Sequence, residues 1–307
     1  MENQTYQLFL SGLTSNQALQ FPLFLLFLLI YLLTLTGNSL ILLLISTDSH
    51  LQTPMYFFLG TLACLDMSCS SVITPRLLFD SYTSKRAISL HDCMAQIFFL
   101  LFFITSEVFL LSAMSYDRYI AICHPLHYRQ IMHQRACTQM ISGVLIVSIA
   151  YSLLHTICAN RLRFCHLTTL QSFFCDLPQL LQFSCTDTFI NLLLVLFFGS
   201  VIGLSNLAIT LYPYIRIIST ILKIKSKNMR HKAFSTCSSH LTVVIMFYGT
   251  CSFNYFLTNT SNISKESIVS IFYTILTPLL NPLIYSLRNK ELKTAFRRTL
   301  HNICVYK

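Results

Sequence analysis

Charged residues are scarce in this 307-residue chain, and acidic ones are scarcer than basic ones. Asp, Glu, Lys and Arg together make up 10% of the sequence, whereas an ordinary soluble domain carries about 25%. The 21 Lys and Arg residues outnumber the 11 Asp and Glu residues, which gives a formal net charge of +10. A solvated surface cannot be built from so few charges. This excludes a soluble enzyme, a nucleic-acid binder and a small disulfide-stapled domain.

Long stretches of the chain contain no charged residue at all. These charge-free runs cover residues 3–47, 136–160, 188–215, 233–264 and 267–287. Each is long enough to cross a bilayer, which takes about 20 residues of helix. Two further segments are equally apolar but carry Asp66 and Glu107 near their middles. The pattern therefore predicts an all-α membrane protein with a bundle of seven transmembrane helices.

We expect a single receptor-sized domain over residues 1–307, with no internal repeat and no linker. The predicted helices cover residues 21–46, 55–80, 93–124, 136–158, 188–222, 232–258 and 266–287, followed by a short surface helix over 289–303. The first run lacks the basic leader and small-residue cleavage site of a signal peptide, so it counts as a helix. In the last range, apolar residues recur at helical spacing with basic residues on the other faces, which is typical of an amphipathic helix on a membrane surface. Cys304 in that helix is either palmitoylated or a plain thiol.

The basic residues predict the orientation of the bundle. With the N-terminus outside, 15 of the 21 Lys and Arg residues fall in cytoplasmic stretches and five fall on the other side, in line with the positive-inside tendency. Three glycosylation sequons, at Asn3, Asn259 and Asn262, then lie outside. Asn3 is the one we expect to be modified, because the other two sit close to the bilayer.

Four of the twelve cysteines lie on the outer, oxidising side: Cys93, Cys165, Cys175 and Cys185. Four cysteines allow three pairings, and their spacing does not choose among them. A bridge from Cys93 to the long loop over residues 159–187 would hold that loop above the mouth of the bundle. No Cys or His cluster has zinc-site spacing, so no metal is expected there.

Seven motifs follow one another along almost the whole chain. They are Gly37-Asn38, Pro54–Leu59 (PMYFFL), Met114–Cys123 (MSYDRYIAIC), Phe173–Asp176 (FFCD), Lys232–His240 (KAFSTCSSH), Phe247–Gly249 (FYG) and Pro278–Lys290 (PLLNPLIYSLRNK). With these motifs in this order, the sequence resembles the olfactory receptors of vertebrates, within the rhodopsin-like G-protein-coupled receptors. One departure is Pro213 in the fifth predicted helix, where the family usually has Ser, because a proline inside a helix tends to kink it.

The resemblance implies a receptor and not an enzyme. A small odorant would bind inside the bundle and activate a heterotrimeric, stimulatory G-protein that raises cyclic AMP. The receptor would lie in the plasma membrane of olfactory cilia, in contact with lipids and with no nucleic-acid partner. The resemblance also pairs Cys93 with Cys175, and we add a Cys165–Cys185 bridge as a hypothesis.

The family comparison assigns an activation switch near the cytoplasmic ends of the helices. Arg118 would face the G-protein, while Tyr214 and Tyr285 close in behind it. A charge pair at this depth can close within the bundle and open when the helices separate. The full set is Asp117, Arg118, Tyr119, Tyr214, Tyr248, Asn281, Pro282 and Tyr285.

Asp66 and Glu107 are predicted to lie at one depth. Each is 11 residues from the cytoplasmic end of its helix, or about 16 Å at 1.5 Å per residue. Two buried carboxylates cannot both stay charged and unpaired, so they would share a proton or a sodium ion. Asn38 lies at a similar depth. The alternative is a structural hydrogen-bond network with no ion and no cofactor.

The predicted ligand pocket lies in the outer half of the bundle and is mostly apolar. Taking Arg118 to fix the phase of the third helix, the pocket residues are Leu100, Leu101, Ile104, Thr105, Phe198, Ile202, Cys251 and Tyr255. No carboxylate lies in this part of the third helix, which argues against an amine ligand and favours a small uncharged odorant. A channel or transporter and an intramembrane enzyme lack support, whereas a related receptor for a metabolite or lipid is the closest rival.

Overall fold

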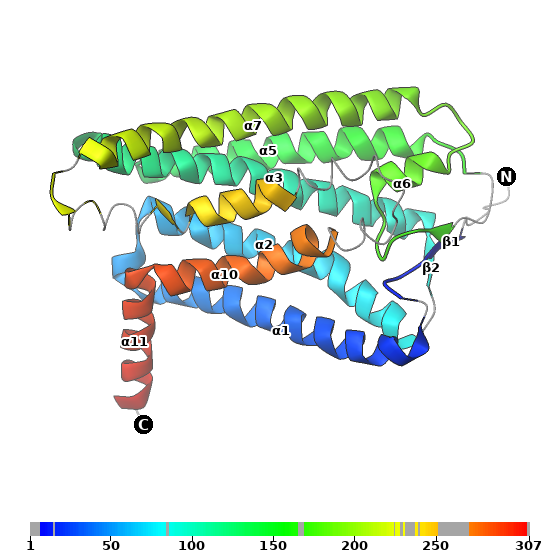
Figure 1. The fold of residues 1–307 in the computed structure, drawn as a ribbon, viewed down its shortest axis with the longest axis horizontal. Helices are drawn as coiled ribbons and strands as arrows, with labels where there is room; N and C mark the ends of the chain where they lie inside the picture. Colours follow the sequence, from blue (N-terminus) through cyan, green and yellow to red (C-terminus); the bar gives the residue numbers. More distant parts are fainter. Residues whose placement is uncertain are drawn as a thin grey trace.

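The structure is a computed structural model of the chain. It describes residues 7–14, 16–83, 86–164, 169–223, 225–227, 230, 237–238, 240–250 and 270–305. Five described helices are long and apolar enough to cross a membrane: α1 (Gln17–Thr47), α2 (Pro54–Thr83), α3 (Leu90–Cys123), α5 (Gln134–Asn160) and α7 (Phe189–Lys223). They run side by side, with the N-terminus near one end of the bundle and the C-terminus near the other (Figure 1).

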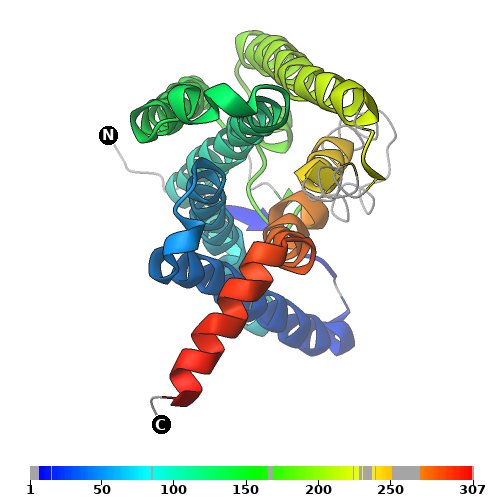
Figure 2. The same cartoon turned by 90° about the vertical axis from the view of Figure 1, so that its left-hand side faces the viewer.

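Two further apolar segments complete the described part of the bundle. One is the helix His240–Thr250, the described portion of the sixth predicted helix. The other is a π-helical turn, Phe272–Leu276, that continues into α10 (Thr277–Arg288). Viewed from the end, these segments close the ring between α7 and α1 (Figure 2). The bundle therefore has the seven-helix arrangement that the hydropathy pattern predicts.

Capping side chains start two of the long helices earlier than their apolar runs suggest. Asn16 caps α1 by accepting the backbone N–H of Ala18 at 3.0 Å. Ser89 caps α3 by accepting the N–H of Asp92 at 3.1 Å while its hydroxyl donates to the Asp92 carboxylate at 2.7 Å. These polar first turns satisfy backbone N–H groups that have no partner within the helix, and hydropathy alone does not detect them.

A small three-stranded sheet covers the end of the bundle near the N-terminus. Strand β1 (Gln7–Leu10) pairs antiparallel with β2 (Ala87–Ser89) and parallel with β3 (Thr169–Leu170), in the order β2-β1-β3. The protein remains all-α in class, but this sheet is an addition that our sequence analysis did not anticipate. Strands of two to four residues show no periodicity that distinguishes them from loops.

Helices α2 and α3 form the centre of the bundle, and α1 and α7 lie at its edge. In their most apolar stretches, 56% of the residues of both α2 and α3 are buried, against 11% in α1 and 6% in α7. Leu25 and Leu29 of α1 and Leu196 and Leu204 of α7 are about half exposed or more. Apolar surface of this extent suits lipid and would be unstable in water.

The N-terminal segment is held across the mouth of the bundle by Arg86. The guanidinium of Arg86 donates to the carbonyl of Ser11 and, at 2.7 Å, to that of Thr14. Gly12 lies between these two residues with φ +69°, and a Cβ there would meet Arg86 Cζ at 3.1 Å. Glycine is therefore required both by the backbone conformation and by the close approach of the guanidinium.

We expect Gly12→Ala to lower the thermal stability of the purified receptor. A left-handed backbone costs about 1–2 kcal/mol with a side chain present, and the added methyl group also pushes Arg86 away. Gly143→Ala is the matched control, because nothing lies within 4 Å of a Cβ at that helical position and alanine favours a helix. Unfolding of detergent-solubilised protein measures both, and equal midpoints for Gly12→Ala and the parent would contradict the assigned conformation.

Candidate functional site

The long loop between α5 and α7 folds back into the mouth of the bundle. A disulfide joins its Cys175 to Cys93 at the start of α3, with 5.4 Å between the Cα atoms. The backbone N–H of Cys175 donates to Gln96 Oε1 at 2.8 Å, and Gln96 Nε2 donates to the carbonyl of Val72 at 3.2 Å. The loop is thus attached to both α3 and α2, with the pairing that the family comparison implied.

Two aromatic residues of this loop act as a plug below the sheet. Phe173 and Phe174 are 1% and 0% exposed and pack in one apolar cluster with Leu100 of α3 and Ile275 of the π-helical turn. In the sequence these two residues stand out only as part of a motif, and their role as lining of the outer bundle was not predicted. The signal available was an aromatic pair next to a bridging cysteine.

The same loop contains a short helix, α6 (Leu177–Gln182), and the other two outer cysteines. Leu180 and Leu181 of α6 are buried against Ala159 at the end of α5. Cys185 takes part in a disulfide. Its hypothesised partner, Cys165, lies outside the described residues.

The predicted pocket residues of α3 lie on two sides of that helix. Leu100 packs with the loop aromatics and α2, whereas Leu101 packs against the cluster formed with α5 and α6. Ile104 packs against the apolar cluster around Phe173 and Phe174. It also packs against the large apolar cluster between α2 and α3, called the central core below. Thr105 is buried. Phe198 and Ile202 are partly buried on α7, which packs along α3. Cys251 and Tyr255 lie outside the described residues.

A layer of carboxylate and amide side chains crosses the middle of the bundle. Asn281 of α10 donates from Nδ2 to both carboxylate oxygens of Asp66, at 3.0 and 3.1 Å. Asp66 and Glu107 are 0% and 2% exposed and are close enough to interact electrostatically. Among the described residues, Glu107 Oε1 and Asn281 Oδ1 have no hydrogen-bond partner, so this layer has free oxygen atoms able to accept a proton or bind a cation.

The third predicted member of the layer, Asn38, holds α1 against α10 instead of contacting the carboxylates. Its Nδ2 donates to the carbonyl of Thr34 at 3.0 Å and to that of Pro278 at 3.1 Å. Beside it, Gly37 allows Pro282 to approach so closely that an added Cβ would lie 3.4 Å from the proline Cγ. Asn281 therefore belongs to the carboxylate layer, and Pro282 to the contact with α1.

Near the cytoplasmic end of α3, Arg118 is in a closed arrangement. Its guanidinium pairs with Asp117, with Nε 2.9 Å from Oδ2, and only 9% of the residue is exposed. Tyr128 donates its hydroxyl to the other oxygen of Asp117 at 2.8 Å. Burial raises the pKa of Tyr128, and the Asp117 carboxylate raises it further, so the hydroxyl remains a donor at neutral pH.

Four further switch residues lie on the helices around Arg118. Tyr214 of α7 is buried and hydrogen-bonded to the imidazole of His240, which lies on the following helix. Helix α7 continues unbroken past Pro213. Tyr285 of α10 is 6% exposed, and its hydroxyl has no hydrogen-bond partner among the described residues. Tyr248 packs against the central core, and Tyr119 Oη lies 3.1 Å from His124 Nε2.

Comparisons with known proteins agree with this arrangement. A family model described as olfactory receptor matches residues 27–303. Human olfactory receptor 8B3 is 42% identical over 294 residues, covering 96% of this chain and 94% of that receptor. Mouse olfactory receptor 8G17 is 46% identical and covers 95% of this chain and 96% of its own length. The chain belongs to the olfactory receptor family.

The fold has a counterpart among solved structures. Squid rhodopsin matches with a TM-score of 0.73 at 16% identity, over 94% of this chain and 87% of that chain. At this identity the match shows the fold alone, a seven-helix bundle of the G-protein-coupled receptor class. Because the chain belongs to the olfactory receptor family and has this fold, the receptor is a multi-pass membrane signalling protein and not an enzyme. Among the described residues, no group of three or more His, Cys, Asp or Glu side chains is placed to hold a metal ion.

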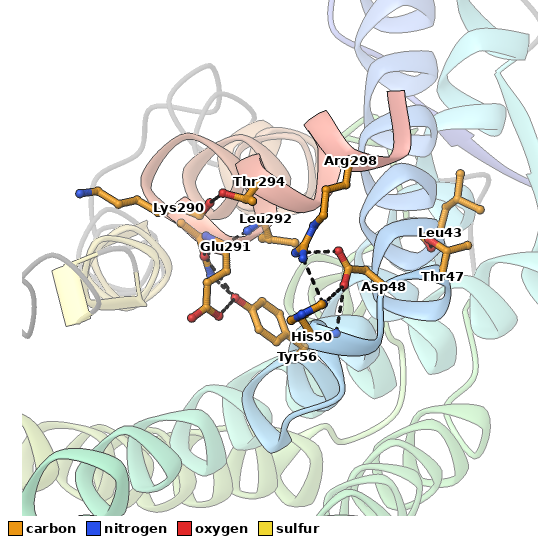
Figure 3. Close-up of polar contacts among 11 residues, drawn as sticks. Leu43, Thr47, Asp48, His50, Tyr56, Lys290, Glu291, Leu292, Thr294 and Arg298 are labelled. Atoms are coloured by element: carbon orange, nitrogen blue, oxygen red, sulfur yellow. Dashed lines mark hydrogen bonds and ion pairs between the residues drawn. The ribbon is translucent and has the colours of Figure 1, made fainter. Parts of the chain in front are cut away.

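At its cytoplasmic end the receptor carries α11 (Lys290–Val305), which runs across the bundle axis (Figure 1). Several polar contacts hold this helix against the rest of the receptor, as Figure 3 shows. Tyr56 donates its hydroxyl to Glu291 Oε2 at 2.7 Å, and Arg298 Nη2 lies 2.8 Å from Asp48 Oδ2. The backbone N–H of His50 lowers the pKa of Asp48, and the Arg298 guanidinium lowers it further.

The apolar face of α11 provides the larger part of its attachment. Leu292 and Ala295 are 2% and 0% exposed and belong to the central core. The Arg298 side chain is 41% exposed, and exposed ion pairs contribute about 0–1 kcal/mol. Removing a buried leucine side chain costs about 2–5 kcal/mol.

From this difference we expect Leu292→Ala to destabilise the receptor clearly more than Arg298→Ala. Unfolding midpoints of the two purified variants test the order, and 0.5 M salt should lower the parent midpoint little. An Arg298→Ala effect equal to or larger than that of Leu292→Ala would mean that the ion pair, and not apolar burial, fixes α11.

The carboxylate layer predicts energetic coupling between Asp66 and Glu107. We expect Asp66→Asn and Glu107→Gln each to change agonist potency, and the double variant to differ from the sum of the single effects because the two groups interact directly. Cyclic-AMP responses at matched surface levels, recorded at several sodium concentrations and pH values, supply the measurement. Strict additivity with no sodium or pH dependence would support two independent structural hydrogen bonds.

Proposed function

We propose that the receptor binds a small, uncharged, mostly apolar odorant in the outer half of the bundle and activates a stimulatory G-protein that raises cyclic AMP. The observation that carries this proposal is the character of α3 beneath the loop plug. From Ile97 to Ser106 the helix contains no charged residue, and Leu100 lies against buried aromatic groups. Such surroundings favour apolar burial, at about 25 cal/mol per Å² before entropy costs.

In this proposal Leu100, Leu101, Ile104 and Thr105 of α3 all line the pocket. Leu100 lines it on the side that packs against the loop aromatics, and Leu101 on the side that faces α5 and α6. Phe198 and Ile202 on α7, one helical turn apart, form the opposite wall. Cys251 and Tyr255, which lie outside the described residues, are proposed as the remaining members of the pocket. Phe173 and Phe174 form its lid. Broad tolerance of ligand chain length follows, because apolar walls discriminate weakly between homologues.

Signalling would begin when ligand binding loosens the closed cluster around Arg118. Breaking the pair with Asp117 and the Tyr128 hydrogen bond frees the guanidinium to meet the G-protein. Tyr214 would break its hydrogen bond to His240 and move next to Arg118. Tyr285, whose hydroxyl has no hydrogen-bond partner among the described residues, would move with it. Tyr119 and Tyr248 pack next to these groups and would shift with the same helices.

The Asp66 and Glu107 layer would hold a shared proton or a sodium ion in the inactive receptor. Its oxygen atoms can bind either one, because Glu107 Oε1 and Asn281 Oδ1 have no hydrogen-bond partner among the described residues. Helix α10 carries both Asn281 and Tyr285. A change in the charge of this layer would therefore bias the cytoplasmic switch through one rigid element.

The proposed location is the plasma membrane of olfactory cilia, with the N-terminus outside. Asn3, the expected glycosylation site, lies outside the described residues, as do Asn259 and Asn262. Lys290, Lys293 and Arg297 of α11 would contact anionic lipid headgroups of the inner leaflet.

The test of the proposed function is a cyclic-AMP assay in cells that contain the receptor and the olfactory G-protein. We expect responses to some members of a panel of alcohols, aldehydes, ketones, esters and hydrocarbons. Amines and carboxylic acids that are charged at neutral pH form the comparison set, and we expect no response to them. Activation only by the charged set, or by non-volatile metabolites or lipids, would overturn the assigned ligand class.

We expect Arg118→Ala to abolish agonist-driven cyclic-AMP production while the protein still reaches the cell surface. The reason is that the proposed role of Arg118 is contact with the G-protein and not packing in the core. Surface labelling supplies the control, and Arg297→Ala on α11 is a comparison variant that should still signal. Equal signalling by Arg118→Ala and the parent at matched surface levels would remove the assignment.

A further inference from the structure

The outer half of α5 buries a polar face and leaves its apolar face uncovered. Its buried residues there are Ser148, Ser152, His155 and Ala159. They are three or four residues apart and therefore share one side of the helix. Large apolar residues on the other sides, such as Ile149, Leu153 and Ile157, are 42%, 44% and 52% exposed. In a membrane, the polar side must therefore face the protein interior.

Three groups on this side of α5 lack hydrogen-bond partners among the described residues: Ser152 Oγ, His155 Nε2 and Thr156 Oγ1, which lies four residues after Ser152. The Ser148 hydroxyl donates to the carbonyl of Val144 at 2.8 Å, as serine commonly does inside a helix. In contrast, Ser152 Oγ and His155 Nε2 have no partner, although these residues are 0% and 2% exposed. Buried polar groups are normally paired, because leaving one unpaired costs free energy. A hydroxyl and an imidazole nitrogen three residues apart are therefore available to a ligand.

The position of this pair relates it to the proposed odorant pocket. Helix α5 packs chiefly against α3. Ala159, one turn beyond His155, lies in an apolar cluster with Ile97 of α3 and Leu180 of α6, and Leu101 packs against the same cluster. His155 therefore faces the side of the bundle where the pocket wall is proposed. The ring of Tyr151 lies 4.4 Å from the imidazole, centroid to centroid, and restricts its rotation.

We infer that Ser152 and His155 form a polar subsite that binds the oxygen atom of an alcohol, aldehyde or ketone odorant. An imidazole nitrogen donates or accepts according to its tautomer, and a hydroxyl does both, so the pair can serve a carbonyl as well as a hydroxyl group. A full charge without a counter-charge is costly to bury, so the pair suits an uncharged oxygen. The inference rests on the proposed function, since it names the group that orients the ligand of that pocket.

The experiment compares a ketone agonist with its analogue that carries a methylene group in place of the carbonyl, tested as an agonist or as a competitor. His155→Phe and Ser152→Ala should each weaken the ketone about three- to tenfold, the loss of one neutral hydrogen bond. The hydrocarbon analogue should be unaffected. His155→Gln should restore part of the ketone potency, because its amide can donate or accept near the position of Nε2. Ser148→Ala, a buried hydroxyl that is already paired, is the matched control and should change neither ligand.

The outcomes separate this inference from the function on which it rests. If the parent receptor responds to no odorant of the panel, the proposed function fails. If the parent responds and the variants weaken both ligands equally at matched surface levels, the pair is structural and the inference fails. Unchanged ketone potency in both Ser152→Ala and His155→Phe would also overturn it. Where His155→Phe does not reach the cell surface, unchanged ketone potency in Ser152→Ala is enough to overturn the inference.

Discussion

Lipid hydrocarbon offers no hydrogen bonds, and this constraint determines where every polar group of the receptor lies. Backbone groups are satisfied within the helices, while polar side chains must turn into the bundle and find partners there. The structure meets this requirement unevenly. Asn38 and Ser148 are bonded to backbone carbonyls within the protein, whereas Glu107 and His155 retain atoms with no partner among the described residues. Asn38 holds α1 to α10, Ser148 is satisfied within its own helix, and the unpaired groups are where we place an ion or a ligand.

Helix α10 connects the polar layers along the bundle. Pro278 and Pro282 lie against α1, Asn281 holds Asp66 of α2, and Tyr285 reaches the cytoplasmic switch region. A shift of this one helix would thus change the carboxylate layer and the surroundings of Arg118 together. Coupling of this kind needs a rigid element with contacts at both sites. Helix α10 meets this requirement through its hydrogen bonds and its close packing against α1.

The two ends of the bundle are closed by different means. At the outer end, a disulfide, a small sheet and the Arg86 contacts hold the loop and the N-terminal segment over an aromatic plug. At the cytoplasmic end, closure depends on an ion pair and hydrogen bonds around Arg118 and Tyr214. Covalent and backbone contacts resist opening, whereas side-chain contacts exchange readily. This difference is our reason for proposing that the movable part of the receptor lies at its cytoplasmic end.

The sequence by itself determined the number of helices, the family and the depth of Asp66, Glu107 and Arg118. These features depend on charge-free runs, ordered motifs and the fixed rise of a helix, all of which are local properties. Tertiary structure alone decided that Asn281 contacts Asp66, that Asn38 bonds to Pro278 instead, and that Phe173 and Phe174 enter the bundle. It also revealed that Ser152 Oγ and His155 Nε2 have no hydrogen-bond partner in the part of the chain that the structure describes. Partners 79 to 240 residues apart depend on how helices rotate and loops return, and no local pattern in a chain encodes those angles.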